Sequence, residues 1–171
     1  TVKSIDRKSG VIHITPKTQS ERGWPCWWHL KVEGAQKGQF ITLKLTASES
    51  EYKSGRVLNA AWSQPDRAAV SVDNVTWSQT PTCRKEDGTA TYRIEVPAET
   101  FWLAWGPPFL PTQADEVLQS LKSRLPGSTL FELAKTRGGR SVQGIRIGDA
   151  NKNDAARYGV WIQARQHAWE A

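Results

Sequence analysis

Short stretches of alternating apolar and polar residues, separated by turn signals, run from residue 1 to about residue 105. Residues 27–32, 39–45 and 90–96 all alternate, so each should place one face in a core and the other in water. Asp87-Gly88 precedes the last of these stretches, and Asp-Gly is a strong hairpin signal. No helical period is present in this part. Many short strands with regular turns predict an antiparallel β-sandwich.

The pattern changes after residue 105. Three prolines fall within residues 107–111, and proline cannot donate a hydrogen bond inside a central strand. A helix is then predicted over residues 113–125, with Thr112 as its N-cap and Asp115 completing a capping box. Its apolar face is formed by Val117, Leu118, Leu121 and Leu125.

Three further strands are predicted after this helix, at residues 129–134, 142–147 and 158–164. The third is almost entirely apolar, which is typical of a strand buried on both faces of an α/β sheet. The expected fold is therefore mainly β and then α/β. We expect a β-sandwich domain in residues 1–106 and the beginning of an α/β domain in residues 107–171.

Composition and charge narrow the class of protein. The net charge is +6, and both halves contribute equally, with 14 basic and 11 acidic residues in 1–110 and 9 and 6 in 111–171. A nucleic-acid surface would concentrate the basic residues, so none is expected. No apolar run approaches the length of a membrane span, so no membrane partner is expected either. Cys26 and Cys83 are expected to be two free thiols in a reducing cytosol, and one disulfide bridge between them is the alternative.

Candidate chemistry lies at the end of the chain, where His167 and Glu170 follow the predicted strand 158–164. Imidazole and carboxylate are both good zinc donors, and α/β sheets place their sites at the carboxyl ends of strands. A catalytic zinc usually takes three protein ligands and one water, so this pair would be part of a site. The alternative is a surface His and Glu at a strand end. His13 and His29 are predicted to be partly solvated strand residues.

Five segments occur together in a recognisable order: 27–34, 73–77, 102–109, 139–144 and 164–170. The second is similar to a D-G-x-x-W hairpin, the fourth to a G-x-S-x-x-G turn and the fifth to an A-R-x-H-P-G-E zinc motif. In this order they resemble the M14 zinc carboxypeptidases, specifically the bacterial relatives of the cytosolic carboxypeptidases. The resemblance covers most of the chain.

This resemblance implies that His167 and Glu170 are the first two zinc ligands of a metallocarboxypeptidase, which removes C-terminal amino acids from peptides or proteins. Arg165 and Trp169 are then candidate wall residues of the site, and Ala168-Trp169 replaces the usual Pro-Gly. The family's third ligand, a His, its substrate-carboxylate-binding residues and its catalytic Glu are expected beyond residue 171. Residues 107–171 would be the incomplete start of the catalytic domain, and the chain alone would be inactive.

The expected partners follow from the same resemblance. They are the C-terminus of a peptide or protein as substrate and the remainder of the catalytic domain, in the same chain or as a cleaved partner. The sandwich should pack against that domain, and the protein should be cytoplasmic. A second function is open: the nine tryptophans suit a β-sandwich that binds carbohydrate or peptide without catalysis. Exposed aromatic residues on one sheet face would favour it.

Overall fold

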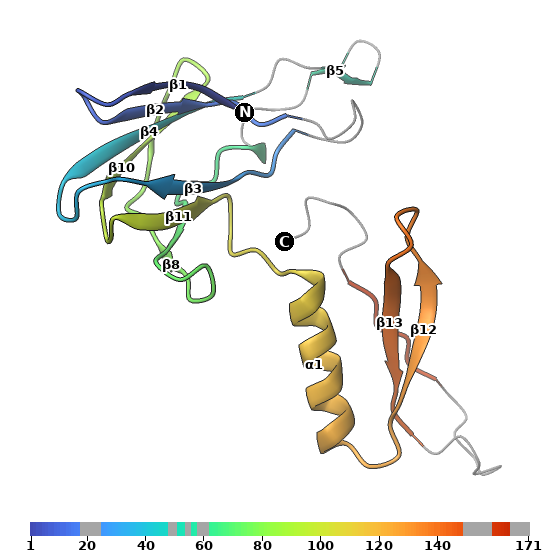
Figure 1. The fold of residues 1–171 in the computed structure, drawn as a ribbon. Coiled ribbons are helices and arrows are strands. Elements are labelled where there is room, and N and C mark those ends of the chain that lie inside the picture. The colour runs from blue at the N-terminus through green and yellow to red at the C-terminus, as the bar shows by residue number, and fades with distance from the viewer. Residues whose placement is uncertain (18–24, 48–50, 54–55, 58–61, 149–158, 165–171) are drawn as a thin grey trace. The chain divides into compact units, whose positions relative to one another are not determined.

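Residues 1–108 and residues 109–163 fall into two compact units, which are built from different elements, and Ala164 is grouped with the first (Figure 1). The computed structural model describes residues 1–17, 25–47, 51–53, 56–57, 62–148 and 159–164. In these residues no helix is long and apolar enough to cross a membrane.

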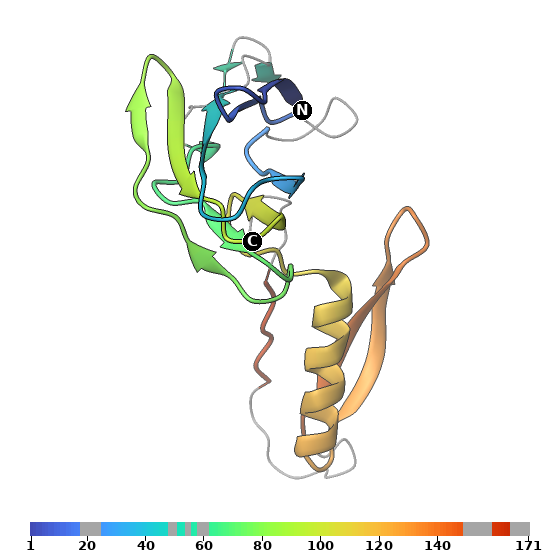
Figure 2. The same cartoon turned by 60° about the vertical axis from the view of Figure 1, so that its left-hand side comes forward.

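The first unit consists of strands in two main sheets, seen from a second side in Figure 2. One sheet has the order β1-β2-β4-β10-β9 and the other the order β3-β11-β7-β8, while β5 and β6 form a separate two-stranded sheet. Every pairing is antiparallel except that of β2 with β4. The strands are β1 (Val2–Asp6), β2 (Val11–Ile14), β3 (His29–Glu33), β4 (Phe40–Thr46), β5 (Glu51–Lys53), β6 (Arg56–Val57), β7 (Ala69–Ser71), β8 (Ser78–Gln79), β9 (Arg84–Glu86), β10 (Thr89–Glu95) and β11 (Thr100–Ala104).

The hydrophobic core lies between these two sheets. Every second residue of β4 and β10 is buried, and the residues between them are more exposed, as the alternation predicts. Phe101 and Leu103 of β11 and the ring of Trp28 join the same cluster from the other sheet. The predicted β-sandwich is therefore confirmed. The two cysteines are free thiols, Cys26 buried and Cys83 partly buried. The disulfide bridge that was the alternative in the sequence analysis is therefore not formed.

A short segment, Ser63 to Pro65, ties the two sheets together through hydrogen bonds. Trp28 donates its Nε1–H to the carbonyl oxygen of Ser63 at 3.0 Å, and Tyr92 donates its hydroxyl to that of Pro65 at 2.7 Å. Gln64 donates to the carbonyl oxygens of Leu45 and Gly88, at 3.0 and 2.7 Å. These bonds satisfy polar groups that burial would otherwise leave unpaired. Burial also raises the pKa of Tyr92 far above its usual value.

The turn between β7 and β8 is organised by Asp73. Its carboxylate accepts hydrogen bonds from the Ser71 hydroxyl at 2.8 Å and from the backbone N–H groups of Val75 and Thr76 at 2.8 and 2.7 Å. These donors hold the pKa of Asp73 well below its usual range, the Thr76 N–H contributing most. Asn74 has a φ of 60°, a left-handed conformation that Asn tolerates better than most residues. The D-G-x-x-W pattern has glycine at this position.

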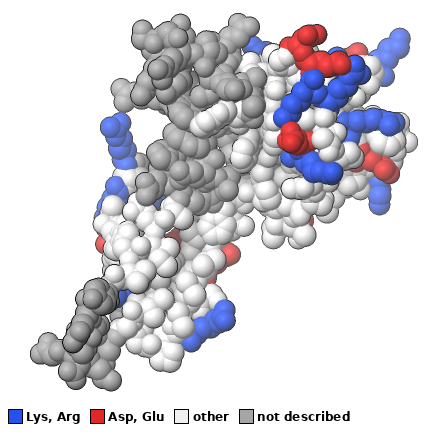
Figure 3. Space-filling view, turned by 180° about the vertical axis from the view of Figure 1, so that it is seen from behind, with Lys and Arg blue, Asp and Glu red and all other residues white. Residues whose placement is uncertain are grey.

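Charged groups of both signs are interspersed on the face of the molecule drawn in Figure 3. Several form ion pairs in the first unit: Lys31 with Glu33 at 2.6 Å, Lys85 with Asp66 at 2.7 Å, and Arg84 with Glu86. All of these side chains are well exposed, so each pair contributes little to stability.

The second unit contains α1 (Pro111–Arg124), β12 (Thr129–Lys135) and β13 (Ser141–Arg146). The helix begins two residues earlier than predicted, so Thr112 is not its N-cap and Asp115 does not complete a capping box. Leu110 is the N-cap, and its N–H donates to Oε1 of Gln113 at 2.6 Å. Pro111 occupies the first helical position, where a missing N–H has no cost and the fixed φ is already helical.

Two of the three strands predicted after the helix are present, and they form the antiparallel hairpin β12–β13. The third prediction, a buried strand over residues 158–164, is wrong for the described part, 159–164, which has no regular structure. Val160, Trp161 and Ile162 are 87%, 66% and 88% exposed. A strand forms only when a neighbour accepts and donates its backbone hydrogen bonds. In the described residues β12 and β13 pair only with each other, so this segment has no such neighbour.

Candidate metal centre

The predicted zinc ligands His167 and Glu170 lie outside the described residues, as do Arg165 and Trp169 of the predicted site wall. Their positions and contacts therefore stay predictions. The chemistry of the pair fits zinc, because an imidazole nitrogen and a carboxylate oxygen are its usual donors together with thiolates. The described segment that leads towards them ends at Ala164.

The described residues just before the motif are apolar and solvent-exposed. Trp161 donates its Nε1–H to Oε1 of Gln163 at 3.3 Å. The apolar surface of Val160 and Ile162 is almost entirely open to solvent, which is unfavourable for side chains of this kind. The segment therefore has the composition of a buried strand without the surroundings of one.

The remaining histidines belong to the sandwich, as predicted. His13 on β2 is partly buried, and its Nε2 lies 2.7 Å from Oγ1 of Thr46, which lies 3.1 Å from Oγ1 of Thr89. His29 on β3 is exposed, and its Nε2 lies 3.0 Å from Oδ1 of Asn74. Among the described residues no three His, Cys, Asp or Glu side chains come together as a metal site would require.

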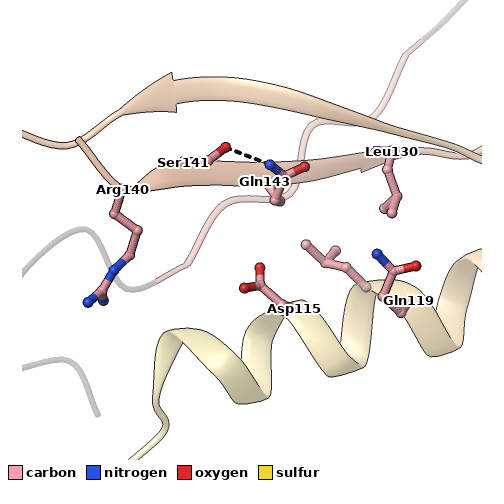
Figure 4. A pocket seen from close by; sticks show the side chains of 7 residues that line it. Asp115, Gln119, Leu130, Arg140, Ser141 and Gln143 are labelled. Carbon is pink, nitrogen blue, oxygen red and sulfur yellow. Dashed lines mark hydrogen bonds between the residues drawn. The ribbon is translucent and has the colours of Figure 1, made fainter.

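A cleft of about 440 Å³, lined by polar and apolar side chains, lies inside the second unit, between α1 and the β12–β13 hairpin (Figure 4). Asp115 and Gln119 point into it from the helix, and Ser141 and Gln143 face it from β13. Gln143 donates to Oγ of Ser141 at 2.5 Å, and that hydroxyl donates to Oε2 of Glu132 at 2.7 Å. The full lining is Asp115, Leu118, Gln119, Leu130, Arg140, Ser141 and Gln143.

This cleft has amide, hydroxyl, carboxylate and guanidinium groups but no imidazole or thiolate, so its lining is not a zinc donor set. Sequence reasoning missed it. Of the predicted apolar face, Leu118 lies towards the cleft, but Val117 is 48% exposed and no residue of α1 is buried. Nothing in the local sequence says which strand residues lie opposite the helix.

Comparison with known proteins connects the sandwich to a family. The sequence model of the cytosolic carboxypeptidase N-terminal domain, an M14 peptidase family, matches residues 1–105. No curated protein matches the chain.

Solved structures share the fold. A metallo-carboxypeptidase from Burkholderia cenocepacia is 22% identical with a TM-score of 0.78, covering 97% of this chain and 41% of that protein. A metallo-carboxypeptidase from Pseudomonas aeruginosa, solved in complex with (2-guanidinoethylmercapto)succinic acid, is 17% identical with a TM-score of 0.67. That match covers 88% of this chain and 38% of the other. The chain thus spans about two fifths of the length of these structures.

The family match covers more than half of the chain, and the β-sandwich observed here occupies the same residues. The chain therefore belongs to the M14 cytosolic carboxypeptidase family and carries that family's N-terminal domain.

Proposed function

We propose that this chain is the N-terminal part of a zinc metallocarboxypeptidase that hydrolyses C-terminal amino acids from peptides or proteins. The observation that carries the proposal is the order of two features along the sequence. The cytosolic carboxypeptidase N-terminal domain occupies residues 1–105, and an H-x-x-E pair of zinc donors follows at 167–170. Solved structures with the same fold are metallo-carboxypeptidases, which supports this reading.

In this proposal His167 and Glu170 hold the metal through imidazole nitrogen and carboxylate oxygen. Zinc, when bound, polarises the scissile carbonyl and lowers the pKa of a bound water to about 7. Arg165 and Trp169 form part of the wall around the substrate. The Ala168-Trp169 pair places a large ring where the related motif has Pro-Gly, so substrate preference at this wall should differ from that of proteins with Pro-Gly.

The proposal also requires a longer protein, which we call the long form: this chain extended to the length of the solved relatives. Two donors leave zinc short of the three protein ligands that catalytic sites use. The third ligand and the catalytic Glu would come from the polypeptide after residue 171. The run Val160–Ile162 supports this, because its large apolar side chains are largely exposed and further polypeptide would cover them. The chain alone should bind zinc weakly and catalyse nothing.

Elemental analysis of the long form tests the metal assignment. The wild type should hold one zinc per chain, and His167→Ala and Glu170→Gln should both lose zinc and release of C-terminal residues. The matched control is His13→Ala, which removes an imidazole that is hydrogen-bonded to Thr46 in the sandwich. It should keep both properties. Full zinc content in the His167→Ala protein would refute the assignment.

We further propose a cytoplasmic location. The family domain is that of cytosolic carboxypeptidases, and the two cysteines are free thiols, as is usual in a reducing compartment. Fractionation of the source cells with an antibody against the sandwich checks this, and recovery outside the cytoplasm would contradict it.

A further inference from the structure

The cleft between α1 and the β12–β13 hairpin collects side chains from elements that are separate along the chain. Asp115, Leu118 and Gln119 are three and four residues apart, so they share one face of α1. Ser141 and Gln143 are two residues apart on β13, so they share the face of the hairpin that is turned towards the helix (Figure 4). Polar groups on two opposite walls can therefore contact one small molecule at the same time.

Two side chains of opposite charge line this cleft without pairing. Asp115 projects from the helix, and Arg140 comes from the turn just before β13 (Figure 4). Neither side chain has an ion pair or a hydrogen bond in the part of the chain that the structure describes. Both residues are exposed. A carboxylate and a guanidinium in one cleft are thus both available to a ligand.

These two charges together define the class of ligand. Arg140 would attract an inorganic anion such as phosphate, but Asp115 would repel it, and a metal cation would meet the reverse. A molecule that carries both a carboxylate and an ammonium group satisfies both side chains, because guanidinium pairs with carboxylate and carboxylate accepts from ammonium. Leu118 and Leu130 provide apolar contacts for the rest of such a molecule.

We propose that this cleft binds a free amino acid with an apolar side chain, Asp115 holding its ammonium group and Arg140 its carboxylate. Gln143 donates to the hydroxyl of Ser141, which leaves its amide oxygen to accept a further hydrogen bond from the ammonium group. The volume of about 440 Å³ suits a small ligand, since small-molecule sites span about 300–1,000 Å³.

The choice of a free amino acid over a short peptide rests on the proposed function, because a carboxypeptidase releases one free amino acid in each turnover. The binding itself needs only residues of the 1–171 chain. The charges that make the contacts are exposed, so binding should be weak, with a dissociation constant on the order of 1 mM. A site of this affinity would fill only where the released amino acid accumulates.

Titration of the 1–171 chain with L-leucine, followed by NMR of its backbone amides, tests the proposal. Chemical-shift changes should be confined to α1, β12, β13 and the turn between the two strands. Leucinamide lacks the carboxylate and 4-methylpentanoate lacks the ammonium group, so each should bind about three- to tenfold more weakly than leucine. Absence of leucine binding, or equal binding of either analogue, would overturn the proposal.

Four substitutions in the 1–171 chain provide a second readout. Asp115→Asn and Arg140→Gln should each weaken leucine binding by about three- to tenfold. The matched controls are Glu116→Gln and Arg137→Gln, which remove the same charges from residues that do not line the cleft. All four residues are exposed, so the fold should be kept, and if a variant unfolds the two analogues decide. An equal loss of binding in all four variants would show a general effect of charge and overturn the proposal.

A dipeptide and the long form separate the remaining outcomes. Tighter binding of leucyl-leucine than of leucine would assign the cleft to a peptide and overturn the proposal. Leucine binding that depends on Asp115 and Arg140, together with a long form that has no peptidase activity, would uphold the cleft and refute only the proposed function. An active long form whose 1–171 chain binds no leucine would uphold the proposed function and refute the cleft.

Discussion

At the scale of single residues, polar side chains fix loops that the hydrophobic pattern alone leaves undefined. Asp73 accepts three hydrogen bonds within the β7–β8 turn and so shapes the loop that presents Trp77 to His29. Gln64 and Tyr92 anchor a segment between the two sheets in the same manner. Such bonds matter less for their own strength than for the cost of leaving their partners unsatisfied.

The stability of the protein at acid pH should depend on the hydrogen bonds that Asp73 accepts in the β7–β8 turn. The folded-state pKa of Asp73 lies below its unfolded value of about 3.9, so its stabilisation is complete above that pH. It is lost as the pH falls through the folded-state pKa. The free energy of unfolding should therefore fall more steeply in the wild type than in Asp73→Asn between about pH 5 and pH 2. Urea unfolding of both proteins across this range measures it. Asp6 and Asp66 titrate in both, so their effects cancel, and parallel curves would contradict the prediction.

At the scale of elements, the local sequence predicts a strand well when its residues alternate between the core and water. Alternation along β4 and β10 identified their buried faces correctly, because the period of a strand is fixed by its geometry. The start of α1 was misplaced because two rules competed: Thr112 is a good N-cap, but Pro111 suits the first helical position better than any position before it. The prediction of a strand over residues 158–164 was wrong for another reason. A buried strand depends on neighbouring strands, and its own sequence does not show whether they are present.

The β12–β13 hairpin depends on Gly144, which leaves room for the ring of Phe131 on the paired strand. A Cβ at position 144 would lie 2.7 Å from the end of that ring, so the ring would have to move. Gly144→Ala should destabilise the second unit by about 1–3 kcal/mol, as overpacking generally does. Hydrogen exchange of residues 129–146 in the 1–171 chain measures it. Gly138→Ala, whose Cβ would be 4.0 Å from its nearest neighbour, is the matched control. Equal protection in both variants would show that the ring moves freely.

At the scale of the whole molecule, the sequence predicted the sandwich, and the family match over residues 1–105 agrees with it. The zinc motif at His167 and Glu170 lies outside the described residues and stays a prediction. The motif could be recognised because His167 and Glu170 are close in sequence. The rest of a metal site is built by residues distant along the chain, which no local pattern specifies. For the same reason the contact between the His29 and Trp77 rings could be found only from strand pairing, which brings these residues together from opposite edges of a sheet.

We propose that the chain begins a zinc metallocarboxypeptidase, and digestion of a defined peptide by the long form tests this. The long form is incubated with zinc and a peptide of known sequence, and the products are followed by mass spectrometry. Residues should be lost one at a time from the C-terminus, with no loss from the same peptide bearing a C-terminal amide and no loss with His167→Ala. Cleavage inside the peptide, absence of any release, or equal release by the His167→Ala protein would contradict it.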